Sequence, residues 1–202
     1  MMLFRKSVLF LLFAFMLSSC TTVEVKTATP EHERLWQQHL ASLTRMGPWS
    51  LSGRAVALVD DSSWHVNLRW SQDAGDADIY LSGPFNQGGV HVSVQEEGYA
   101  ELQTDKGETF IGHDVESLLY QQLGWAVPVR GFRYWMLGMP HPEHHAEGRE
   151  LDELGRLRKL TQLGWALDYR AYKDLPNGSL PRKLYLTQGD LKLKLVVQEW
   201  RI

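Results

Sequence analysis

The chain is poor in cysteine, because Cys20 is the only one among its 202 residues. A disulfide within the chain and a paired-thiol redox motif are therefore excluded. The sequence also lacks a glycine-rich loop that could cradle a phosphate and a Gly-x-Ser-x-Gly elbow that could present a nucleophilic serine. Together with a predicted lipid anchor and an aromatic-rich sheet, these absences argue against an enzyme, and no cofactor is predicted.

No apolar run in the sequence is long enough to cross a bilayer. The run at 8–17, VLFLLFAFML, has ten residues and follows Arg5 and Lys6. A membrane-spanning helix needs about 20 apolar residues, whereas a basic start and a short apolar core are typical of a secretory signal peptide. Residues 1–19 are therefore predicted to be a signal peptide.

The signal peptide ends in a sequence that resembles the lipobox of bacterial lipoproteins, Leu17-Ser18-Ser19-Cys20. The resemblance implies cleavage before Cys20, a diacylglyceryl group on its sulfur and a third acyl chain on its new amino group. Three acyl chains, at ~0.8 kcal/mol per buried methylene, anchor a protein almost irreversibly. Thr21 follows where Asp would favour inner-membrane retention, so the analogy favours the outer membrane. Residues 20–29 then form a polar tether.

The charge balance gives no reason to expect nucleic-acid binding. Removing residues 1–19, which contain two cations and no acid, changes the formal net charge from −3 to −5. Nucleic-acid sites instead concentrate Lys and Arg. The remaining length fits one domain, and no internal repeat divides residues 30–202.

Hydrophobic periodicity predicts a helix, then strands, then helices, then strands. Thr29 and Pro30 begin the first helix, which Gly47 and Pro48 end. Asp114 and Pro128 begin two further short helices. About eleven strands are expected with generous boundaries, and period-two alternation is read in the ten ranges 49–59, 64–70, 79–81, 90–95, 99–104, 109–111, 157–162, 165–172, 184–186 and 191–200, with 175–181 as a loop. The fold class is α+β, with an antiparallel meander.

One hairpin carries a large apolar side chain at its tip. Phe85 lies in the turn-forming stretch 82–89, between the alternating runs of 79–81 and 90–94. Two interpretations are open. Phe85 folds back as a plug on the sheet, or it is a hydrophobic finger directed at a membrane or an acyl chain.

The stretch 141–149, HPEHHAEGR, is the one histidine-rich segment. His141 and His145 could share a helix face, but Glu143 does not occupy the position that zinc-protease motifs require. Because prolines flank its start, the stretch is predicted to be a solvated loop without a metal site, and adventitious metal binding is the alternative.

Several short motifs in a fixed order resemble the LolB family of outer-membrane lipoprotein receptors, over nearly the whole mature chain. They are the lipobox, Gly53-Arg54-Ala55, Leu68-Arg69-Trp70, Leu81-Ser82-Gly83-Pro84-Phe85, Gly124-Trp125-Ala126-Val127-Pro128, Trp135-Met136-Leu137-Gly138-Met139-Pro140, Gln162-Leu163-Gly164-Trp165 and the segment 191–200. The resemblance implies an incomplete, strongly curved antiparallel β-barrel of eleven strands, capped by three helices and enclosing an apolar cavity.

The resemblance also implies a function. Such a protein, a monomer anchored through Cys20, accepts lipoproteins from the periplasmic carrier LolA, binds their acyl chains and delivers them to outer-membrane lipid. A protruding loop of the family contacts the membrane, and Gly83, Pro84 and Phe85 match it. Candidates for lining the acyl-chain cavity, some of them expected to be ordinary core, are Trp64, Val66, Leu68, Trp70, Ile79, Leu81, Val92, Val94, Leu119, Trp135 and Met136.

Two other functions compete with the receptor. One is a structural lipoprotein that scaffolds an assembly machine of the envelope through the same sheet. The other is an anchored hydrolase that uses one of the histidines with a nucleophile and an acid. An apolar cavity fit for an acyl chain favours the receptor over both.

Overall fold

The computed structural model describes residues 29–202 except positions 60–61, 87, 96–97, 124–126 and 177, so the signal peptide and Cys20 lie outside it. Its helices are α2 (Pro30–Thr44), α3 (Val115–Leu123), α4 (Val129–Leu137) and the short 3-10 turn η2 (Pro84–Asn86). Its strands are β1 (Trp49–Val59), β2 (Ser62–Asp73), β3 (Asp76–Ser82), β4 (Gly89–Val94), β5 (Ala100–Thr104), β6 (Thr109–Gly112), β7 (Ala146–Leu151), β8 (Leu157–Gln162), β9 (Trp165–Leu175), β10 (Gly178–Gln188) and β11 (Leu191–Arg201).

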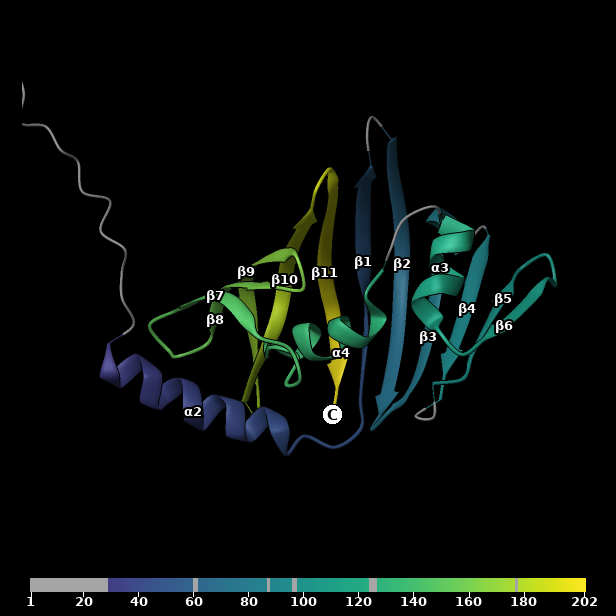
Figure 1. The fold of residues 1–202 in the computed structure, drawn as a ribbon. Coiled ribbons are helices and arrows are strands. Elements are labelled where there is room, and N and C mark those ends of the chain that lie inside the picture. Colours follow the sequence, from purple (N-terminus) through teal and green to yellow (C-terminus); the bar gives the residue numbers. More distant parts are fainter. Residues whose placement is uncertain (1–28, 60–61, 87, 96–97, 124–126, 177) are drawn as a thin grey trace, which may run out of the picture.

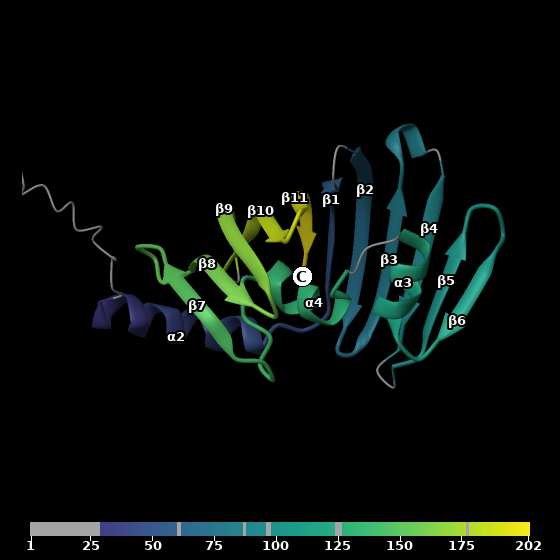
Figure 2. The ribbon, with the colours of Figure 1, turned by 45° about the horizontal axis from the view of Figure 1, so that its top comes forward.

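The eleven described strands form one antiparallel sheet that does not close. Their order is β6-β5-β4-β3-β2-β1-β11-β10-β9-β8-β7, so β6 and β7 are the two edges. The sheet curves around α3 and α4, and α2 runs along the side that carries β7 to β10 (Figures 1 and 2). The predicted α+β class and the incomplete barrel with three helices are confirmed. In the described part of the chain, no helix is long and apolar enough to cross a membrane.

The helix boundaries follow from local capping residues, of which the sequence predicts Thr29 and Asp114. The Thr29 hydroxyl accepts a hydrogen bond from the backbone N–H of His32 at 3.3 Å, and Pro30 opens α2. The Asp114 carboxylate accepts one from the N–H of Glu116 at 3.2 Å at the start of α3. Gly138, with φ of +81°, ends α4 in the left-handed conformation that glycine adopts without strain.

Strand register places the alternating apolar residues on one face of the sheet. Leu51 pairs with Trp70 across β1 and β2, and Trp70 pairs in turn with Ile79 of β3. Residues opposite one another in a ladder point to the same face. This inner face carries the buried core, whereas Lys192 and Lys194 of β11 lie exposed on the outer face.

Two sequence predictions about the second half of the chain are wrong. The supposed loop 141–149 contains most of β7, and most of the supposed loop 175–181 is strand, because β9 extends to Leu175 and β10 begins at Gly178. The alternation of β7 is weak because it is an edge strand, and ion pairs help to hold it. Arg149 contacts Glu33 at 2.7 Å, and Glu150 contacts Lys159 of β8 at 2.9 Å.

Candidate functional site

A cavity of about 200 Å³ is lined by the inner face of the sheet and by the helices α3 and α4. Nine of the residues proposed from sequence line it: Trp64, Val66, Leu68, Trp70, Ile79, Leu81, Val92, Leu119 and Met136. The others are Ala55, Ala57, Gln122, Val127, Val129, Phe132, Leu186, Leu193, Lys194 and Leu195. The wall therefore comes from β1, β2, β3, β4, β10 and β11, and the helices cover it.

The lining is a surface for hydrocarbon rather than for a polar ligand. Gln122 supplies the polar side chain of the lining, because the side chain of Lys194, which is also at the cavity wall, projects to the outer face of β11 over the Tyr185 ring. An engineered apolar cavity of about 150 Å³ stays free of water and binds benzene. A cavity of about 200 Å³ with this lining therefore accommodates part of an acyl chain.

Trp64 marks the end at which the cavity opens. It lines the cavity near the start of β2, yet 61% of its surface is exposed. Leu68 and Trp70, farther along β2, are buried. The cavity therefore reaches solvent at the end of the sheet where β1 connects to β2, and we call this the open end.

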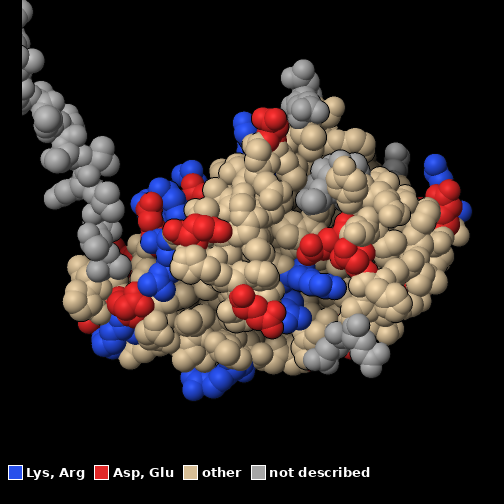
Figure 3. All heavy atoms as spheres, viewed as in Figure 1, with Lys and Arg blue, Asp and Glu red and all other residues tan. Residues whose placement is uncertain are grey.

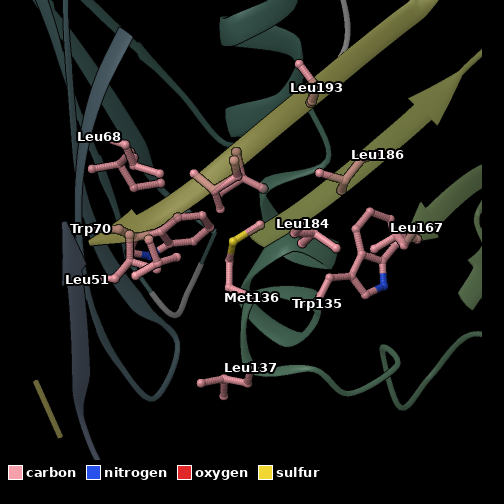
Figure 4. Packing of buried hydrophobic residues seen from close by; sticks show 14 of the residues in the cluster. Leu51, Leu68, Trp70, Trp135, Met136, Leu137, Leu167, Leu184, Leu186 and Leu193 are labelled. Atoms are coloured by element: carbon pink, nitrogen blue, oxygen red, sulfur yellow. The ribbon is translucent and has the colours of Figure 1, made fainter. Parts of the chain in front are cut away.

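Two sequence-proposed residues do not line the cavity. Val94 pairs with Ala77, one inner-face pair farther from the open end than Val92, and borders a separate hollow. Trp135 is fully buried on the other side of α4, its ring centroid 5.6 Å from that of Phe132. Figure 4 shows Met136 extending from α4 toward the sheet and Trp135 turned toward Leu167 of β9.

Phe85 lies at the tip of the β3–β4 connection and is not a core plug. Its side chain is 93% exposed, and its backbone has φ of +59°, which bulky residues rarely adopt. Two bonds hold the base of the turn: the N–H of Gly83 donates to the Gly88 carbonyl at 3.1 Å, and the Asn67 side-chain amide donates to the Gly83 carbonyl at 3.1 Å. Since the strands alternate in direction, this connection lies at the open end.

A buried glutamine, Gln162, which was not predicted from the sequence, holds α4 against β8. The Gln162 Oε1 atom accepts from the Trp135 indole N–H at 2.9 Å and from the His141 backbone N–H at 2.8 Å. Its Nε2 donates to the carbonyls of His141 at 3.0 Å and His144 at 2.7 Å. A buried amide with four such bonds ties α4 and the following segment to β8. Its place two residues after Leu160, on the same face of β8, was the one available signal.

His141 is buried rather than solvated, which corrects the sequence prediction for this residue. Its ring lies 4.7 Å from the Tyr134 ring and 4.6 Å from the His144 ring, measured between centroids. Burial, and then the nearby His144, lower the pKa of His141 below its ordinary value. Among the described residues, no group of three or more His, Cys, Asp or Glu side chains could hold a metal ion.

The face of the molecule that carries α3 and α4 is largely uncharged. Figure 3 shows acidic and basic residues scattered over it, with broad uncharged areas between them. Among the described residues on this face, charges of both signs are interspersed, whereas a nucleic-acid site concentrates Lys and Arg.

Comparison with known proteins gives consistent results. The model of the family described as "Outer membrane lipoprotein LolB" matches residues 47–200. An outer-membrane lipoprotein LolB of Nitrosococcus oceani is 33% identical over 187 residues, which are 93% of this chain and 92% of that protein. One of Halorhodospira halophila is 31% identical over 192 residues, 94% of this chain and 92% of that protein. A LolA superfamily protein of Nitrosomonas europaea shares the fold alone, with a TM-score of 0.52 at 5% identity over 83% of this chain and 93% of that one.

Proposed function

The chain belongs to the LolB family of outer-membrane lipoproteins, and on this basis we propose how it handles its cargo. Its function as a receptor in lipoprotein localisation follows from the family. The proposed mechanism is that it accepts lipoproteins from a periplasmic LolA-type carrier, holds their acyl chains in the cavity and releases them into outer-membrane lipid. It acts as a monomer and without a chemical step, so the chain supplies binding surfaces rather than catalytic groups.

The apolar cavity that opens beside Trp64 is the observation that carries this proposal. Burying a methylene stabilises by ~0.8 kcal/mol, so an acyl chain of about sixteen carbons gains roughly 12 kcal/mol in a bilayer. A cavity of about 200 Å³ covers only part of such a chain. The protein therefore binds cargo less favourably than lipid does, and transfer to the membrane proceeds downhill without nucleotide hydrolysis.

The proposed anchor and the Phe85 tip support a position of the open end at the membrane. Cys20, outside the described residues, is proposed to carry the acyl chains, and residues 20–29 span up to roughly 35 Å when extended. Phe85, with Gly83 and Pro84 at its base, is proposed to enter the lipid interface. The tip and the open cavity lie at the same end of the sheet, so a released acyl chain meets lipid directly.

The hydrolase alternative finds little support in the position of His141. Its Nδ1 atom accepts the backbone N–H of Glu143 at 3.2 Å, and burial disfavours its protonated form. A structural scaffold would use the sheet surface and would not need a cavity lined by hydrocarbon. Blocking the cavity therefore discriminates between the receptor and both alternatives.

The test uses two neighbouring residues on opposite faces of β1. Ala55 lines the cavity, whereas the side chain of Val56 points to the other face. A phenyl ring is the size of ligand that an apolar cavity of about 150 Å³ admits, so Ala55→Phe fills most of the available space. We expect Ala55→Phe to lose acceptance of lipoprotein from a loaded LolA-type carrier, while Val56→Phe retains it. Equal acceptance by both folded variants would refute a role for the cavity.

A further inference from the structure

A second apolar side chain lies at the tip of a turn in a strained conformation. Leu163 and Gly164 form the two-residue connection of β8 and β9, closed by the pair Gln162 and Trp165. Their φ angles are +55° and +73°. Two-residue hairpins with both angles positive strongly favour Asn-Gly, because Asn tolerates the left-handed conformation and leucine does not. The Leu163 side chain is nevertheless 37% exposed to solvent.

Phe85 is likewise a large apolar residue with a positive φ angle at the tip of a turn. In the described part of the chain, Ala74 is the third residue other than glycine with positive φ, and it is small. Leu163 and Phe85 are thus the two large apolar residues held in this conformation, each at the tip of a turn. Backbone strain that a simple substitution would relieve points to a functional reason for the side chain.

Both tips lie at the open end of the sheet. The strands alternate in direction through β4-β3-β2-β1-β11-β10-β9-β8, so the β3–β4 and β8–β9 connections share one end with the β1–β2 connection. Five strand-to-strand steps separate β3 from β9, which is roughly 24 Å along the curved sheet. Trp64 and the opening of the cavity lie between the two tips.

We propose that Leu163 is a second point of membrane contact, which acts with Phe85 to hold the open end of the cavity against the lipid surface. The inference rests on the proposed function. One apolar tip would leave the domain free to rotate about it, whereas two tips on either side of the opening set its orientation. Isolated apolar side chains at this spacing suit the interface of a bilayer, since a stable protein partner would need a contiguous area of about 800 Å².

The first test removes the apolar tip and keeps the turn. The protein is the mature chain, residues 20–202 with Cys20→Ser, so that acyl anchoring does not mask weak contacts. Leu163→Asn restores the favoured Asn-Gly turn, so its melting temperature should equal or exceed that of the parent. Binding to phosphatidylethanolamine–phosphatidylglycerol vesicles should weaken roughly tenfold through the lost apolar contact.

Leu154→Asn is the matched control, because Leu154 is 61% exposed in the β7–β8 connection at the opposite end. It should bind like the parent. Unchanged binding by Leu163→Asn would overturn the proposal.

The second test reports contact directly. Since Cys20 is the only cysteine, Cys20→Ser allows an environment-sensitive fluorophore on one introduced cysteine at position 163, 85 or 154. Vesicles should shift the emission to the blue at 163 and at 85 and leave it unchanged at 154. A shift at 85 alone would refute the role of Leu163 and leave the proposed function intact. No shift at either tip would refute both the second contact and the membrane-facing open end. An equal shift at 154 would show contact without orientation and would also refute the proposal.

Discussion

The exposed tip of the β3–β4 connection allows uptake of cargo to be separated from its delivery. Phe85 is 93% exposed, so Phe85→Glu leaves the new charge in water and should change the free energy of unfolding by no more than about 0.5 kcal/mol. A buried, unpaired charge would instead cost several kcal/mol. At the membrane, the lost Phe contact is worth about 2–3 kcal/mol, which corresponds to lipid contact weaker by a factor of roughly 30 to 140.

A two-stage assay measures the consequence. The first stage scores transfer of lipoprotein from a loaded LolA-type carrier to soluble receptor, and the second scores transfer from the receptor to liposomes. Phe85→Glu should complete the first stage and fail in the second, whereas Phe85→Leu, which keeps a large apolar tip, should complete both. A large drop in melting temperature with both stages lost would show that Phe85 supports the fold. Normal delivery by Phe85→Glu would show that the tip does not contact lipid.

Three further predictions concern the fold and the anchor. Gln162→Leu leaves buried hydrogen-bonding groups without partners and should lower the free energy of unfolding by about 2–4 kcal/mol in urea titrations; a change below about 0.5 kcal/mol would refute its role in holding α4. Burial lowers the pKa of His39 and of His141, so at acidic pH the unfolded chain binds more protons than the folded protein does. The free energy of unfolding should therefore be highest above about pH 6.5 and should fall as the pH drops below that value. A profile that stays flat between about pH 8 and 5 would contradict this. Cys20→Ser with a cleavable signal peptide should give a soluble periplasmic protein that still accepts lipoproteins; a folded protein that cannot accept them would show that the anchor does more than localise.

The elements that depend on neighbouring residues in the sequence could be predicted from it. Thr29, Asp114 and Gly138 cap helices where their chemistry requires, and the period-two alternation of β1 and β2 placed Val66 and Leu68 on the face that became the inner one. Strand β7 was missed because its edge position needs no apolar alternation, and its ion pair to Glu33 joins segments far apart in sequence.

The features that sequence could not predict depend on depth and on long-range contacts. Alternation assigns a face but not a position along the strand, so it could not exclude Val94 from the cavity. Helical spacing likewise could not separate Met136, which lines the cavity, from its neighbour Trp135, which packs away from the cavity against Trp165 of β9. The left-handed conformation of Leu163 contradicts the preference of leucine itself, so no propensity could indicate it.

The most direct measurement of the central claim is the location of the cargo acyl chain on the receptor. A lipoprotein with a photoreactive group near the end of an acyl chain is transferred from the carrier to the soluble receptor, irradiated, and digested for mass spectrometry. We expect adducts on side chains that line the cavity, such as Leu68 of β2, Leu193 of β11 and Met136 of α4. Adducts confined to the outer face of the sheet, around Tyr185 and Lys192, would contradict it, as would the absence of adducts when transfer is complete.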